Sequence, residues 1–104
     1  MLVDVTKELK TYTGQTMMDS DGQGNAVPAT IKLVLISVLN IPVQTDKLMQ
    51  KLAKDELTRK IFKAEKEVEL TAEDVVMIKG CMENATMLTP VVVGQTLRIL
   101  EGKE

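Results

Sequence analysis

The spacing of apolar residues predicts four helices that follow an irregular N-terminal region. The clearest pattern covers residues 46–65, where apolar side chains recur every three or four residues: Met49, Ala53, Leu57, Ile61 and Ala64, with Leu48 and Leu52 widening the stripe. On the polar side, Asp55 precedes Arg59 by four residues and Glu56 precedes Lys60 by four. This orientation is typical of an exposed, ion-paired helix face.

Two Leu-Thr dipeptides mark the starts of two further helices, at residues 72–85 and 90–101. Thr71 precedes acidic residues and Thr89 precedes Pro90, so both threonines are expected to accept hydrogen bonds from first-turn amides as N-caps. The short connection between the two helices predicts an antiparallel hairpin. In the second helix we expect one inward stripe with two apolar residues beside it: Val93, Leu97 and Leu100, flanked by Val92 and Ile99. Gly94 lowers the helix propensity of this segment. The close approach of a neighbouring backbone would explain why a glycine stands at this position.

Residues 29–40 are apolar nearly all round, so periodicity alone does not separate a buried helix from a buried strand. Their β-branched residues favour a strand. Their length, Pro28 near the start and Asn40-Ile41-Pro42 at the end favour a helix, which we predict. A helix without a polar face must be covered on all sides.

Residues 1–27 are predicted to form a β-hairpin or extended arm that ends in a mobile loop at residues 19–25, rich in glycine and aspartate. Residues 6–10 are alternatively compatible with a helical turn. The predicted fold is therefore mainly α: about four helices with a short N-terminal β-hairpin or extended arm. We expect one domain over residues 1–104, with residues 28–104 as the helical core.

Composition adds that the core is aliphatic. The chain has seven methionines but only two aromatic residues, Tyr12 and Phe62. An ordinary aliphatic core explains this, and a methionine-bearing docking surface is the alternative. The one cysteine, Cys81, lies on the expected inner side of its helix and is interpreted as a buried, inert thiol in a reducing compartment.

The sequence offers little for catalysis, and we predict no enzyme, no catalytic residue, no cofactor and no metal. The absence of histidine removes the commonest general base and metal ligand. The loop that begins at Asp19 resembles the start of a calcium loop, but its fifth residue is Gln23 and its twelfth is Thr30, where a bidentate glutamate belongs. A solvated turn is the better interpretation.

Charge argues against nucleic acid and membrane partners. The net charge is −2, and the basic residues of the Lys-rich face of residues 46–65 are interleaved with acids. The apolar runs are too short to span a membrane, and no signal peptide is recognisable, so a cytoplasmic protein is expected. A small regulator that contacts nucleic acid through that face is the alternative function.

Self-association, most simply as a homodimer, is expected because the apolar surface exceeds what a small monomer can cover. The candidate interaction surface consists of residues from the first and last predicted helices: Ile31, Leu35, Val38, Val92 and Ile99. In the opposing interpretation, Val3, Val5 and Leu9 fold back as a lid and complete a monomer.

Residues 61–101 carry short sequence words, notably Pro90-Val91-Val92-Val93-Gly94-Gln95, together with Ile61-Phe62-Lys63-Ala64, Val68-Glu69-Leu70-Thr71-Ala72-Glu73-Asp74, Ile78-Lys79 and Leu100-Glu101. In these words the chain resembles small uncharacterised proteins encoded in tailed-phage and prophage genomes. The resemblance implies a phage origin and a helical domain, without catalytic residues. The expected function is a non-enzymatic protein-interaction module of a phage or prophage, in particle assembly or binding a host protein, located in the bacterial host cytoplasm or the virion.

Overall fold

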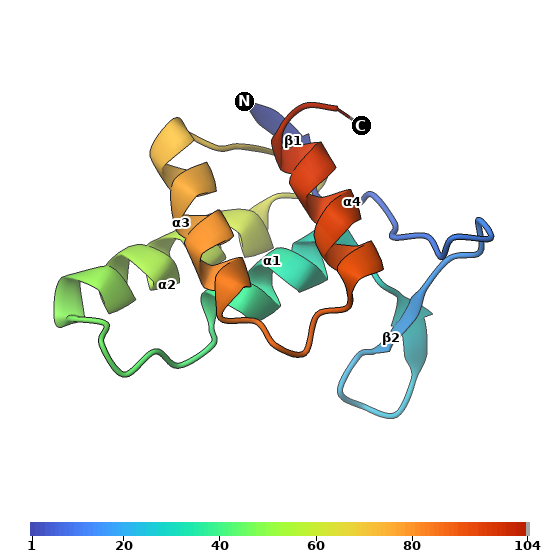
Figure 1. Cartoon of the computed structure of the whole chain (residues 1–104), viewed down its shortest axis with the longest axis horizontal. Helices are drawn as coiled ribbons and strands as arrows, with labels where there is room; N and C mark the ends of the chain where they lie inside the picture. The colour runs from blue at the N-terminus through green and yellow to red at the C-terminus, as the bar shows by residue number, and fades with distance from the viewer. Residues whose placement is uncertain (104) are drawn as a thin grey trace.

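The computed structural model describes residues 1–103 and contains, within them, four helices and two small antiparallel sheets (Figure 1). The elements in chain order are β1 (Leu2–Asp4), β2 (Met18–Ser20), β3 (Ala26–Pro28), α1 (Ile31–Leu39), α2 (Leu48–Lys63), β4 (Glu67–Glu69), α3 (Ala72–Glu83) and α4 (Pro90–Leu100). The four predicted helices are present, each within two residues of its expected bounds. Residues 31–39 form a helix and not a strand, and Thr30 is its N-cap.

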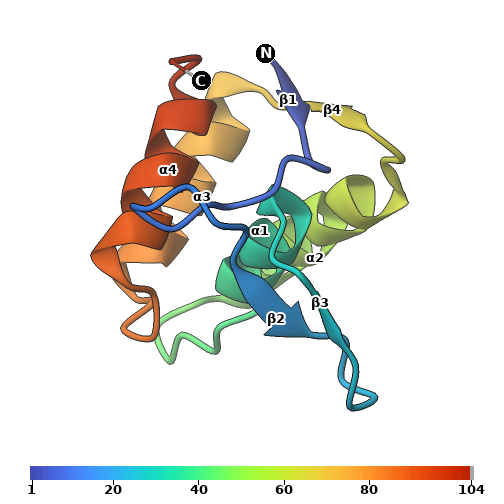
Figure 2. The same cartoon turned by 90° about the vertical axis from the view of Figure 1, so that its right-hand side faces the viewer.

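Helix α1 lies at the centre of the molecule and is covered from several directions (Figures 1 and 2). It packs against α2 and α3, and the N-terminal segment crosses its beginning. Ile31, Leu35 and Val38 are fully buried. A helix without a polar face has to be covered on all sides, and other parts of the same chain cover α1.

The N-terminal segment is part of the core and not a separate arm. Strand β1 pairs with β4, with Val3 opposite Val68. Further along, the first-turn amides of Ile31 and Lys32 donate to the carbonyl oxygens of Lys7 and Val5, at 3.0 and 2.9 Å. The segment thereby satisfies helix-start amides that have no partner within α1. It also buries Val3, Val5 and Leu9, as in the lid interpretation, so the expected division between residues 1–27 and 28–104 does not describe the packing.

A hairpin is present, but its strands β2 and β3 lie on either side of the glycine-rich loop, whereas the sequence placed that loop after the hairpin or arm. This hairpin projects from the helices (Figure 2). The residue pair next to the loop places Ser20 opposite Ala26. Residues 6–10 do not form the alternative helical turn: Glu8 bridges Thr30, and Lys10 bridges Thr16. The backbone of Lys10 is held by Gln95 of α4, whose side chain accepts from its N–H at 2.8 Å and donates to its carbonyl oxygen.

Helices α3 and α4 run antiparallel, as expected (Figure 1). The hydroxyl of Thr71 accepts from the N–H of Asp74 at 3.0 Å, and the Asp74 carboxylate accepts from the N–H of Thr71 at 3.0 Å, which completes a capping box. Thr89 stands at the N-cap of α4, before Pro90, but its side chain makes no capping hydrogen bond. The expectation for Thr71 is confirmed, and that for the Thr89 hydroxyl is wrong.

The inward face of α4 also differs from the predicted stripe. Val92, Thr96, Ile99 and Leu100 are buried, whereas Val93 and Leu97 are only half-buried. In this orientation Gln95 reaches the N-terminal segment, and the small Thr96 faces inward, where its hydroxyl has no hydrogen-bond partner among the described residues. Gly94 faces only the Arg98 side chain, 3.3 Å from where a Cβ would stand, so no backbone approach requires it.

Candidate interaction surface

The five residues of the predicted interaction surface lie inside the single chain. Ile31, Leu35 and Val38 are 0% exposed, and Val92 and Ile99 are 8% and 6% exposed. This corrects the prediction: the N-terminal segment, α2 and α3 cover α1, and α4 turns its Val92–Ile99 side inward. The argument for a dimer that rested on these residues no longer holds, and any interaction surface has to be found elsewhere.

The largest apolar exposure on a helix lies along α2. Only Leu57 and Ile61 of α2 are buried, so most of the predicted apolar stripe does not face the core. Leu48, Met49 and Phe62 are 71%, 73% and 69% exposed, and Leu52 is 47% exposed. Helix α2 forms one edge of the molecule, and its first turns lie beyond the end of α1 (Figure 1).

Five residues of α2 lie in a line on the side away from the core, and we call them the outer stripe: Leu48, Leu52, Asp55, Arg59 and Phe62. Their spacing of four, three, four and three residues keeps them on one helix face. Asp55 and Arg59 form the predicted ion pair, with Nε 2.9 Å from Oδ2, while Phe62 lies beneath the Lys32 ammonium, 5.9 Å from the ring centroid. The outer stripe is therefore apolar at both ends and carries one charge of each sign in the middle.

A second apolar feature is a groove between α2 and α3. One cavity of about 280 Å³ is lined by Met49, Gln50, Ala53, Lys54 and Met77. A neighbouring cavity of about 310 Å³ shares Ala53 and Met77 with it and continues toward Lys60 and Glu73. The two cavities adjoin at these shared walls, and we call the pair of them the methionine groove.

The methionine groove is apolar at one end and acidic at the other. Glu56, Glu73 and Asp74 line the far end together with Lys60, whose ammonium is 3.6 Å from the Asp74 carboxylate. Lys60 thus pairs with Asp74 of α3, whereas the sequence predicted a pair with Glu56. One lysine against three carboxylates leaves this end negative, which favours a basic ligand.

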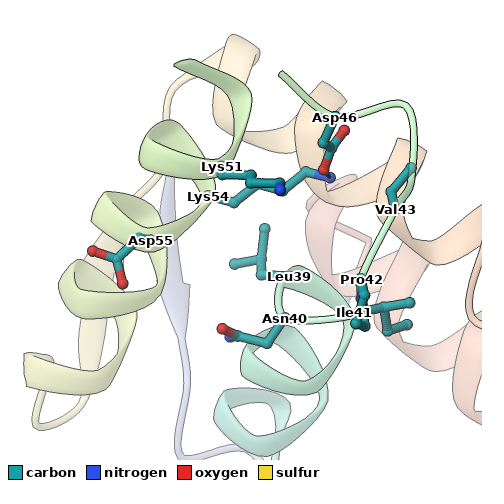
Figure 3. A pocket seen from close by; sticks show the side chains of 9 residues that line it. All are labelled: Leu39, Asn40, Ile41, Pro42, Val43, Asp46, Lys51, Lys54 and Asp55. Carbon is teal, nitrogen blue, oxygen red and sulfur yellow. Dashed lines mark hydrogen bonds and ion pairs between the residues drawn. The ribbon is translucent and has the colours of Figure 1, made fainter. Parts of the chain in front are cut away.

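On another face of α2, an ion pair connects the helix to the loop that precedes it. Asp46 and Lys54 form a hydrogen-bonded pair with side chains that are only 12% and 15% exposed, beside a cavity of about 180 Å³ whose floor includes Leu39 (Figure 3). Asp55 and Lys51 line the same cavity, but Asp55 points away from the pair. The pair connects residues 40–47 to α2.

Cys81 lies beside this ion pair and is buried, as predicted. Burial raises the pKa of its thiol, and the nearby Lys54 ammonium lowers it by less. The hydrogen bond to Asp46 raises the pKa of Lys54. A thiol kept protonated by burial is a poor nucleophile, and the arrangement is that of a structural contact.

The hairpin loop has the hydrogen bonds of a turn. The Asp21 carboxylate accepts from the backbone N–H groups of Gln23 and Asn25, at 2.7 and 3.2 Å, and from the Asn25 side chain at 3.0 Å. The Asn25 side chain and these backbone donors lower the pKa of Asp21. Within residues 1–103, no group of three or more His, Cys, Asp or Glu side chains is placed to hold a metal ion.

Three of the six basic residues on the Lys-rich face of residues 46–65 form ion pairs within the chain. Lys54 pairs with Asp46, Arg59 with Asp55, and Lys60 with Asp74. Likewise, Gln95, which a helix-turn-helix interpretation of α3 and α4 would need for base contacts, is bound to Lys10.

Comparison of the chain with protein-family models, curated proteins and solved structures found no match. Within the part of the chain that the structure describes, no helix has the length and apolarity needed to cross a membrane. The surface of α2 therefore has to be interpreted from its own chemistry.

The signal that sequence reasoning missed lies within α2 itself. Two helical series are superimposed there: Leu57 and Ile61, which face the core, and Leu48 and Leu52, which belong to the outer stripe. Merging the two gave a single wide stripe. The charged residues Asp55 and Arg59 in line with Leu52 mark the second series as solvent-facing.

Proposed function

We propose that this protein is a non-enzymatic protein-interaction module that binds a helix of a partner protein in the methionine groove. The observation that carries the proposal is the pair of adjoining cavities between α2 and α3, with Met49, Ala53 and Met77 among the residues that line them. Grooves between two helices commonly accept the apolar face of an amphipathic helix. Methionine side chains suit such a site because they are flexible and polarisable.

The charges of the groove specify the partner helix further. The distance along α2 from Met49 to Lys60 is about 16 Å, which is about three helical turns. A helix of that length would place apolar residues against Met49 and Met77, and basic residues near Glu56 and Glu73. The expected ligand is therefore an amphipathic helix with one basic end.

The phage context of this module comes from the resemblance of residues 61–101 to small proteins of tailed phages and prophages. In that setting the partner is another phage protein during particle assembly, or a protein of the bacterial host. Either occurs in the host cytoplasm, or in the particle once assembled. The structure also leaves the surface of α2 free for a second copy of the chain.

The proposal is tested by affinity capture of the tagged full-length chain from cells that encode it, with quantification of the co-purifying proteins. Met49→Asp places a charge at the apolar end of the groove, on a side chain that is mostly exposed. We expect it to reduce recovery of a specific partner at least about tenfold, because burying a methionine contributes about 1.5–3 kcal/mol.

Val76→Asp is the matched control. Val76 is 70% exposed, close to the value for Met49, and it lies on α3 outside the groove lining. It should leave recovery unchanged, and circular dichroism should show both variants folded. The proposal fails if every protein recovered by the wild type is recovered equally by Met49→Asp.

A further inference from the structure

We infer that the outer stripe of α2 is a homodimer surface on which a second copy packs its own α2 antiparallel. The inference rests on the proposed function in that it concerns an interaction module, but it assigns a different surface and names the partner. The sequence predicted a dimer through residues that the structure buries. The outer stripe, in contrast, is exposed along the whole helix.

The first argument is the spacing of the stripe. Leu48, Leu52, Asp55, Arg59 and Phe62 follow the alternating three- and four-residue steps by which one helix presents a seam to another. The remaining faces of α2 are occupied: Leu57 and Ile61 contact the core, while Ala53 and Met49 line the groove. A helix partner for the stripe has to come from outside the chain.

The second argument is self-complementarity. Leu52 and Phe62 are equally distant from Leu57 along α2, and so are Asp55 and Arg59. In an antiparallel pair centred on Leu57, Leu52 of each copy therefore faces Phe62 of the other. In the same register, Asp55 of each copy faces Arg59 of the other. A two-fold interface requires that each residue meet its complement in this reciprocal way.

Other arrangements of the same two helices lack this match. A parallel pair would place Asp55 beside Asp55 and Arg59 beside Arg59, and like charges across an interface are strongly unfavourable. Sliding the antiparallel pair by one heptad would set Leu48 and Leu52 against Arg59 and Asp55. The charge pattern thus selects one orientation and one register.

The stripe is also prepared for binding. Asp55 and Arg59 already hold each other at 2.9 Å, and the Lys32 ammonium covers one part of the Phe62 ring surface while the side chain stays largely exposed. Ordering these side chains on association costs less because contacts within the chain already restrict them. A single helix pair is a small interface, so we expect a weak dimer.

Charge reversal tests this register directly. Asp55→Arg places two arginines opposite each other, and Arg59→Asp places two aspartates opposite each other, so each variant alone should dimerise at least about tenfold more weakly. The double variant D55R/R59D restores opposite charges. Mixing the two single variants does the same, because each supplies the charge that the other lacks, and a heterodimer should form.

The measurement is light scattering with sedimentation velocity, from about 10 µM to about 1 mM protein, the range suited to a weak interface. The wild type and the mixture should rise above the monomer mass of 11.5 kDa, whereas the single variants should remain near it. Val76→Arg, on α3 away from the stripe, should behave as the wild type. Circular dichroism establishes that every variant is folded.

The inference is overturned by a wild type that stays at 11.5 kDa throughout, by single variants that dimerise like the wild type, or by a mixture that stays monomeric. These outcomes leave the proposed function standing if Met49→Asp still abolishes partner capture. Conversely, a dimer with the expected charge dependence, together with unchanged capture by Met49→Asp, overturns only the proposed function.

Discussion

Thr71 and Thr89 occupy the same position, the N-cap, in α3 and α4, and only Thr71 uses its hydroxyl there. The difference lies in the first helical turn that follows each threonine. Thr71 is followed by a turn whose third residue, Asp74, returns a hydrogen bond to the Thr71 N–H. Pro90 follows Thr89 and already removes one amide that would need a partner.

This difference gives a prediction at the residue scale. Thr71→Ala should lower the free energy of unfolding by about 1 kcal/mol, because it leaves the Asp74 amide without its acceptor. Thr89→Ala should change it by less than about 0.5 kcal/mol. Urea denaturation of both variants measures the two effects, and equal losses would contradict this account of the caps.

At the scale of elements, α2 connects three parts of the molecule through different faces. Leu57 and Ile61 join it to the core, Lys60 joins it to α3, and Lys54 joins it to the loop before it. Lys54 is the most buried of its lysines that form ion pairs. Its contact with Asp46 therefore holds the loop more effectively than an exposed pair could.

Lys54→Met tests the importance of this contact. The methionine keeps most of the side-chain volume but leaves the Asp46 carboxylate unpaired in a nearly buried place, which should cost about 1–3 kcal/mol of unfolding free energy. Lys51→Met, on an exposed lysine one turn earlier, should change stability by less than about 0.5 kcal/mol. Adding Asp46→Asn to Lys54→Met should cost less than the two single effects combined.

The same contact sets a direction for pH dependence. The folded state raises the pKa of both Lys54 and Cys81, so it binds their protons more tightly than the unfolded chain does. Their contribution to stability is full below the ordinary thiol pKa of about 8.5 and is lost as the pH rises further. The midpoint temperature of thermal unfolding of the wild type should therefore fall in alkaline solution. Lys54→Met should lose only the part of this fall that comes from Lys54, which occurs above the ordinary lysine pKa of about 10.4.

At the scale of the whole molecule, the N-terminal segment completes the core. It contributes a strand to β4, acceptors to the first turn of α1, and the buried side chains of Val3, Val5 and Leu9. Without it, the apolar surface of α1 would remain open. Its closure gives the single chain a covered core, so a dimer is not needed to bury α1.

Leu9→Ala tests this closure. Leu9 is fully buried, and its loss should reduce the free energy of unfolding by about 2–5 kcal/mol, since the cavity cannot be filled locally. Leu2→Ala, on a largely exposed residue of the same segment, is the control and should be nearly neutral. Guanidinium denaturation compares the two, and a small effect of Leu9→Ala would show that the segment is dispensable.

The sequence by itself determined where the four helices lie and how α3 begins. Helix periodicity, caps such as Thr71 and breakers such as Pro42 act within a few residues, so they can be read without knowing the neighbours. It also correctly favoured a helix for residues 31–39, because length and end signals outweighed β-branched composition. The buried Cys81 follows from the same local reasoning.

Only the tertiary structure decided which apolar face of each helix is buried. Leu48 and Leu57 have equal hydrophobicity, and their exposure differs because they lie on opposite faces of α2, only one of which packs against the core. In the same way, β1 pairs with a strand far along the chain, and Gln95 of α4 binds Lys10 of the N-terminal segment. Such contacts join residues that are remote in sequence, so local patterns cannot specify them, and the candidate surface moved from α1 and α4 to α2.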